Sequence, residues 1–234
     1  MALVTAATIA CAATEVNWPQ PTLPDDLTTI PLGRAMTMDG LPMRMAGFVS
    51  AKPPGVLLDA LRRSFGQPQV ESSHGGKRIL GRAEGRFYLT VQIEPAGSGS
   101  KGIVSTVDLG ELAKNQAAIA RSKAHWLARL PAGSTVASDL RSEDGGKSAR
   151  HTVILNGHGQ ARNRDAMVAL LASDGYTLER EVAAAGQTGS SDAVRTATTL
   201  HFSAPGKEAM AVITQTGERS AIVLNTVSTK EANQ

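Results

Sequence analysis

Four methionines lie close together in residues 36–45, and their spacing places four sulfur atoms within reach of one another. Met36 and Met38 precede an Asp39-Gly40 pair, and Met43 and Met45 follow it. Asp-Gly is favoured in tight hairpin turns because the central residues need positive φ. Alternate residues of a strand share a face. The sequence therefore predicts a hairpin with all four thioethers on one face.

Thioether sulfur is a soft ligand that suits Cu(I), so these methionines are a candidate copper site, and no other cofactor is expected. Met also forms adaptable contact surfaces, which makes a partner-binding surface the preferred interpretation. A second hairpin is expected around Asp144-Gly145. Aligned on the Asp-Gly pairs, its positions equivalent to the four methionines are Arg141, Glu143, Ser148 and Arg150. Because these residues are polar, we do not expect this face to belong to the core.

A second group of candidate residues lies in a loop rich in Gly and Asn, where Asn156, His158 and Arg162 could bind a polar ligand. A hydrolase that uses His158 is one alternative function. However, the five histidines show no zinc-hydrolase spacing, and the chain lacks the G-x-S-x-G motif of a nucleophile elbow. No catalytic residue is assigned, and the sequence favours a protein without enzymatic activity.

The first residues resemble a targeting segment. Residues 2–13 are small and apolar and end in Cys11-Ala12-Ala13, which is typical of a secretory signal with an A-x-A-like cleavage site, although no basic residue precedes them. Residues 8–11 also resemble a bacterial lipoprotein box, so Cys11 is a candidate for lipidation. We expect an exported protein, periplasmic or associated with the outer membrane. A lipid at Cys11 is the one form of membrane anchoring that the sequence offers.

Composition restricts the classes of partner. The 234 residues are 41% hydrophobic, which is enough for a globular core. The 24 basic and 21 acidic residues are interspersed and leave a net charge of +3, and aromatic residues make up only 3%. A chain without a basic stripe and with few stacking platforms is not expected to bind nucleic acid. No apolar run approaches the ~20 residues that span a bilayer.

The order of expected elements is similar in the two halves. Residues 36–66 read as a hairpin followed by a helix that begins at Pro53-Pro54 and ends at Gly66. A hairpin and a helix return over residues 136–175, and several strands follow in both halves. The sequence therefore predicts an α+β fold made of two tandem copies of a β-hairpin–helix–antiparallel-sheet unit, joined by a helix, as a pseudo-duplication.

The expected boundaries follow from this order. They are a signal peptide or lipoprotein signal over 1–13, a Pro-rich extended lead-in over 14–31, a first unit over 32–110, a linking helix over 111–130, a second unit over 131–229 and a tail over 230–234. The preferred function is a non-enzymatic protein-binding or structural accessory module that contacts other envelope proteins, for example in a secretion or pilus assembly. A periplasmic Cu(I)-binding protein and a hydrolase of unknown substrate are the alternatives.

Overall fold

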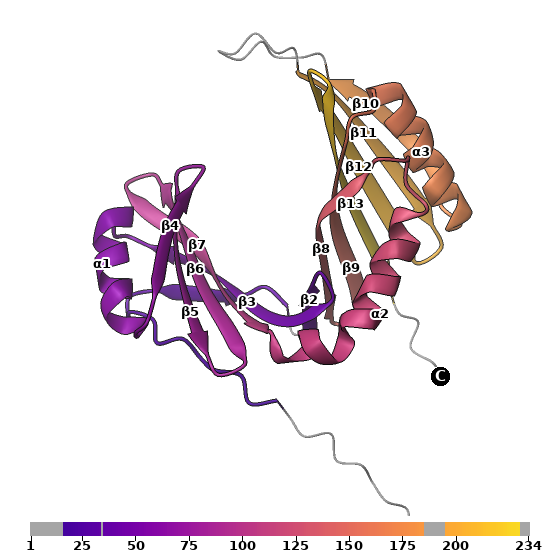
Figure 1. Cartoon of the computed structure of the whole chain (residues 1–234). Coiled ribbons are helices and arrows are strands. Elements are labelled where there is room, and N and C mark those ends of the chain that lie inside the picture. The colour runs from indigo at the N-terminus through magenta and orange to yellow at the C-terminus, as the bar shows by residue number, and fades with distance from the viewer. Residues whose placement is uncertain (1–15, 34, 185–194, 230–234) are drawn as a thin grey trace, which may run out of the picture.

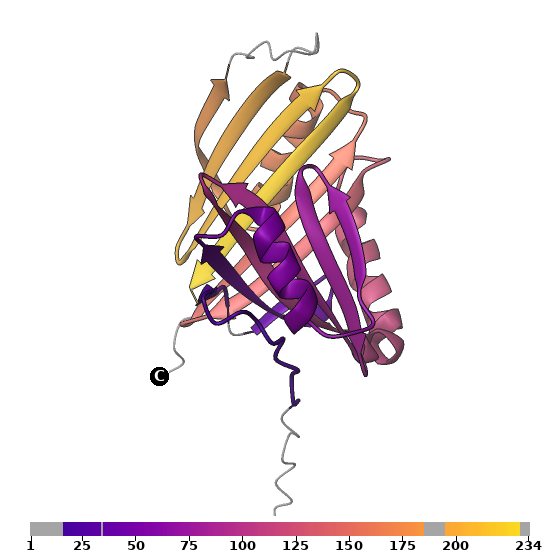
Figure 2. The ribbon, with the colours of Figure 1, turned by 90° about the vertical axis from the view of Figure 1, so that its left-hand side faces the viewer.

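A computed structural model describes residues 16–33, 35–184 and 195–229. In this part of the chain, 13 strands form one antiparallel sheet, and three helices lie on one face of it (Figure 1). The sheet curves toward its helix-free side, so that its two ends face each other in Figure 1. Viewed from the side of the first helix, one half of the sheet stands in front of the other (Figure 2). No helix in the described residues is long and apolar enough to cross a bilayer.

The elements of the first half begin with a short strand in the lead-in. They are β1 (Thr28–Pro31), β2 (Ala35–Met38), β3 (Leu41–Ser50), α1 (Pro54–Ser64), β4 (Val70–His74), β5 (Lys77–Glu84), β6 (Phe87–Ala96) and β7 (Gly99–Asp108). Asp39 and Gly40 form a two-residue turn with φ of 51° and 83°, which explains the Asp-Gly pair at that place. Burial alternates along β6, because only one of its faces packs against α1.

The second half begins with the longest helix. Its elements are α2 (Gly110–Leu127), β8 (Thr135–Asp144), β9 (Lys147–Asn156), α3 (Gln160–Ser173), β10 (Thr177–Ala184), β11 (Arg195–Ala204), β12 (Lys207–Thr216) and β13 (Arg219–Thr229). Both hairpins of β11–β12 and β12–β13 are in register over their full lengths. β10 and β8 each carry one irregularity in register, after Leu178 and after Val136.

The predicted fold class, two tandem α+β units joined by a helix, is wrong. The strand order is β10-β11-β12-β13-β9-β8-β2-β3-β7-β6-β5-β4, with β1 beside β3. β2 pairs with β8 as well as with β3, placing Met36 opposite Ser142 and Met38 opposite Leu140. Strand pairing therefore continues from one edge to the other as a single sheet. Local patterns show where hairpins lie, but they do not show which strands from distant segments pair.

Two clusters of buried residues lie between this sheet and its helices. Around α1, Leu57, Leu61 and Phe65 pack on Leu80 and Leu89. The second cluster combines residues of α2 and α3 with the strands beneath them, among them Trp126, Met167, Leu171, Ile154, Leu200, Ile213 and Ile222. All three helices thus contribute to burying the same face of the sheet.

The lead-in packs on the first cluster through Trp18. Its ring centroid lies 5.3 Å from that of Phe87, and the guanidinium of Arg44 lies 5.2 Å from the Trp18 ring centroid. The expectation of an extended lead-in left out β1, which adds four residues to the sheet beside β3.

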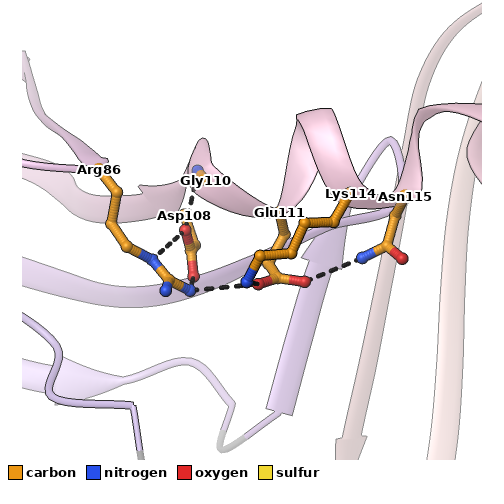
Figure 3. A network of polar contacts seen from close by, with 6 residues as sticks. All are labelled: Arg86, Asp108, Gly110, Glu111, Lys114 and Asn115. Atoms are coloured by element: carbon orange, nitrogen blue, oxygen red, sulfur yellow. Dashed lines mark hydrogen bonds and ion pairs between the residues drawn. The ribbon is translucent and has the colours of Figure 1, made fainter.

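A polar network fixes the start of α2 (Figure 3). The carboxylate of Asp108, which is 1% exposed, accepts two hydrogen bonds from the guanidinium of Arg86. It also accepts a hydrogen bond from the backbone N–H of Gly110 at 3.0 Å. Glu111 extends the network through Arg86, Lys114 and Asn115 (Figure 3). Asp108 therefore accepts the backbone N–H of the first residue of α2 and ties the helix to the turn between β5 and β6.

The hydrogen bonds from Arg86 lower the pKa of Asp108 below its ordinary value, against the opposing effect of burial. A carboxyl whose pKa is lower in the folded state stabilises the fold above its unfolded pKa of about 3.9, and this contribution is lost as the pH falls.

We predict that Asp108→Ala lowers the free energy of unfolding by about 1–3 kcal/mol at pH 7, since Arg86 loses its charged partner and the Gly110 N–H loses its acceptor. The difference from wild type should shrink as the pH falls below about 4. Chemical denaturation at several pH values measures both effects. The matched control is Asp59→Ala, which removes an exposed carboxylate on α1. Equal losses for the two variants would show that Asp108 has no special role.

Candidate functional site

The face of the sheet opposite the helices, called the helix-free face here, is the first candidate surface. It consists of the strand residues that alternate with the core residues. In β9 and β13, for example, Val153 pairs with Val223, whereas the neighbouring Ile154 and Ile222 are buried beneath the helices. No described helix covers this face (Figure 1).

Exposed apolar side chains are concentrated on the helix-free face. The described residues include eleven exposed large hydrophobic side chains, and the register of the strands places six of them on this face. Val70 is the most exposed, at 66%. The six are Ile30, Val49, Val70, Leu155, Val182 and Val227. They lie on six different strands, from β4 at one edge of the sheet to β10 at the other, so they share a face and do not form one cluster.

Charge is confined to the margins of this face over the central strands β2, β3, β8, β9 and β13. On these strands, the charged side chains of the helix-free face that the structure describes lie at strand ends, as Lys147 and Arg219 do. The middle carries apolar residues together with uncharged polar ones. His151 Nδ1 and Asn225 Oδ1, 2.6 Å apart, form a hydrogen-bonded pair there. Covering this central region would therefore remove few charges from water.

The four methionines of the predicted copper or partner site share the helix-free face by register. Met36 pairs with Met43, and Met38 pairs with Leu41, two residues before Met43 and four before Met45. Met36 and Met43 are only 7% and 2% exposed, whereas Met38 and Met45 are half-buried. The first two are therefore packing residues. Among the described residues, no group of three His, Cys, Asp or Glu side chains could hold a metal.

The predicted alignment of the two hairpins is wrong by one residue. The second turn is Gly145-Gly146, with φ of 55° and 77°, and it corresponds to Asp39-Gly40. A shift of one residue moves every side chain to the other face of a sheet. The positions compared with the methionines therefore lie on the helix-covered face; they are Arg141, Glu143, Ser148 and Arg150.

We predict that Met43→Ala lowers the free energy of unfolding by about 2–4 kcal/mol, since it deletes a buried side chain. Met45→Ala, at a half-buried position on the same strand, is the matched control and should cost clearly less. Thermal or chemical denaturation measures both. Similar losses would indicate that Met43 is not packed as described.

Cu(I) binding through these methionines stays a prediction. Titration of Cu(I) into wild type and into the variant with Met36, Met38, Met43 and Met45 all replaced by Leu tests it directly. Loss of affinity in the variant would support a copper site. Equal affinity would leave the four side chains with packing and contact roles.

The predicted ligand loop connects β9 to α3. The side-chain amides of Asn156 and Asn163 donate to each other at 2.9 and 3.0 Å, and Asn163 is fully buried. His158 Nε2 donates to the carbonyl oxygen of Ala132 at 2.7 Å. Arg162 is exposed on the first turn of α3. The contacts of Asn156 and His158 hold the start of α3, and ligand binding by this loop stays a prediction.

Cys11 and the predicted signal of residues 1–13 lie outside the described residues.

Two adjoining cavities lie on the helix-covered face beside α2. The first, of about 340 Å³ and called the apolar cavity, is lined by Gly40, Ile119 and Val136 among others. The second, of about 470 Å³ and called the basic cavity, is lined by Arg129, Lys207 and others. The two cavities share four lining residues, which are Ser122, Trp126, Arg141 and Arg150. None of the residues of the predicted ligand loop lines either cavity.

An ion-pair cluster forms the wall between these cavities. Arg150 donates to both carboxylate oxygens of Asp139, from Nε at 2.6 Å and from Nη2 at 2.9 Å. Its guanidinium lies 4.2 Å from the ring centroid of Trp126. Arg141 Nη2 donates to Asp139 at 3.2 Å, and the hydroxyl of Thr152 donates to it at 3.3 Å. The carboxylate is thus shared by two guanidinium groups.

The pKa of Asp139 reflects these contacts. Burial raises it, but the hydrogen bonds and charge of Arg150, together with the charge of Arg141, outweigh burial and hold the pKa below its ordinary value. Sequence reasoning did not single out Asp139, and it assigned Trp126 only to the apolar side of the linking helix. The spacing of Asp139 and Arg141, two residues apart on a strand and therefore on one face, was the available signal.

Searches among protein-family models, curated proteins and solved structures returned no match for this chain. Function is therefore inferred from the geometry of the chain itself.

Proposed function

We propose that this protein is a non-enzymatic binding module that contacts another protein through its helix-free face. The observation that supports this proposal is that six of the eleven exposed large hydrophobic side chains of the described residues lie on that face. Apolar sheet faces are normally covered by another layer. Here the described helices all lie on the opposite side, so a partner would supply the missing layer (Figure 1).

The chemistry of the face indicates what the partner presents. Its central strands offer aliphatic groups such as Val153 and Val223 beside uncharged polar groups such as Ser142 and Asn225. A complementary segment carries apolar side chains and uncharged hydrogen-bonding groups. Charged side chains would lose hydration at the centre without gaining an opposite charge. The curvature of the sheet lets both of its ends flank a segment that lies across the middle (Figure 1).

The proposal includes the place where binding occurs. Export to the bacterial envelope rests on the sequence of residues 2–13 alone, and it makes another envelope protein the expected partner. A component of a secretion or pilus assembly is one class of such partners.

We predict that a photoreactive residue at Val227 or Leu155 cross-links to one discrete partner in cells, whereas the same residue at Val56 does not. Val56 is equally apolar and is exposed on α1, on the other side of the sheet. Mass spectrometry identifies the adduct. Equal adducts from all three positions, or adducts only between copies of this chain, would contradict the proposal.

The purified partner then allows a quantitative test. Val227→Glu should weaken its affinity at least tenfold, because a charge would be buried without a partner. Val56→Glu should leave the affinity unchanged. Calorimetry measures both affinities, and the unfolding free energy of each variant shows that the fold is intact. An affinity insensitive to Val227→Glu would exclude the helix-free face as the contact.

A further inference from the structure

The basic cavity beside α2 lies on the helix-covered face, so the proposed protein contact does not use it. It is built from four parts of the chain: α2 with the turn after it, the strands β8 and β9, the end of α3, and β12 with β13. At about 470 Å³ its size falls among those of small-molecule sites, which are commonly about 300–1,000 Å³.

The cavity carries an excess of positive charge. Four cationic side chains line it: Arg129, Arg141, Arg150 and Lys207. Two carboxylates offset part of this charge. Asp174 forms an ion pair with Arg129 at 2.6 Å, and Asp139 forms ion pairs with Arg150 and Arg141. The four cationic side chains and these two carboxylates leave a formal charge of +2 around the cavity. Such a balance favours a ligand that carries two negative charges.

Hydrogen-bond donors remain free for a ligand. A guanidinium has five N–H donors on three nitrogens. Among the described residues, the hydrogen bonds of Arg129 all come from its Nη2, and the one hydrogen bond of Arg141 also comes from its Nη2. Lys207 Nζ donates to the carbonyl oxygen of Asp174 at 2.8 Å and keeps two further N–H groups. It also lies 4.9 Å from the ring centroid of Tyr176. These groups suit the oxygens of a phosphate-like anion.

Trp126 supplies an independent indication. Its side chain lines the cavity and is only 9% exposed, and its buried indole N–H has no hydrogen-bond partner among the described residues. A buried donor without an acceptor costs free energy, and native structures seldom leave one unpaired. A ligand oxygen at this wall would become its acceptor after a shift of the ring, because the nitrogen itself is buried.

We propose that the basic cavity binds a phosphate-type dianion, such as the head group of a small phosphate monoester. The free guanidinium donors of Arg129 and Arg141 and the ammonium group of Lys207 contact its oxygens. The ring of Trp126 stacks beneath Arg150 and forms the apolar wall. The neighbouring apolar cavity, which shares this wall, has room for the uncharged part of the molecule.

The test uses Trp126 as its own reporter. The chain contains two tryptophans, so the full chain with Trp18→Phe retains Trp126 alone. Inorganic phosphate, sulfate and acetate are titrated at constant ionic strength while the fluorescence of Trp126 is recorded, and calorimetry repeats the titration on wild type. Saturable binding of phosphate and sulfate, with acetate at least tenfold weaker, is expected. No saturable response to phosphate in either measurement would overturn the proposal, and acetate binding as tightly as phosphate would overturn the assignment of a dianion.

Arg141→Gln is expected to weaken phosphate binding about tenfold, since one charged hydrogen-bond donor is removed. Arg141 makes only one hydrogen bond to Asp139, at 3.2 Å, and the fold should tolerate the change. Arg63→Gln, at an exposed position on α1, is the matched control and should bind like wild type. Lys207→Gln is a second variant with the same expected loss. Unchanged affinity in both cavity variants would overturn the site.

Discussion

The pairing of β2 with β8 is the constraint on which the rest of the structure depends. β2 has four residues and pairs with β3 on one side and with β8 on the other. The adjoining turn strengthens this contact: Asp39 N–H donates to the carbonyl oxygen of Asp139 at 2.8 Å, and Asp139 N–H donates to the Asp39 carboxylate at 3.1 Å. This short strand joins two groups of strands into one sheet, and it makes the helix-free face continuous across the molecule.

Helix α2 completes the other side of the same junction. Asp108 fixes its start against the first half of the sheet, and Trp126 joins the core of the second half. Between these ends, Ile119 packs on the β2–β3 turn, where a Cβ on Gly40 would lie 2.9 Å from the Ile119 side chain. The helix thus spans the β2–β8 junction and closes the two cavities over it. One face of the junction serves the proposed protein contact, and the other serves the proposed anion site.

The sequence predicted what depends on neighbouring residues. Asp39-Gly40 indicated the first hairpin, and Pro53-Pro54 and Gly66 bracketed α1. The linking helix expected over 111–130 overlaps α2, which begins one residue earlier and ends at Leu127. The β2–β8 pairing depends on residues about a hundred positions apart and leaves no local pattern. Choosing Asp144-Gly145 as the second turn, in place of Gly145-Gly146, put Arg141 and Arg150 on the wrong face. The ion-pair cluster around Asp139 was therefore not predicted, although every residue in it was visible.

Hydrogen exchange of the backbone amides in residues 35–38 and 140–143 tests the central claim, a single sheet joined at β2 and β8, most directly. The structure predicts that amides of both segments bonded across the junction are protected, and that the two halves lose protection together in denaturant. Rapid exchange in residues 35–38, with separate unfolding of the strands on either side, would contradict the single sheet and both binding surfaces that depend on it.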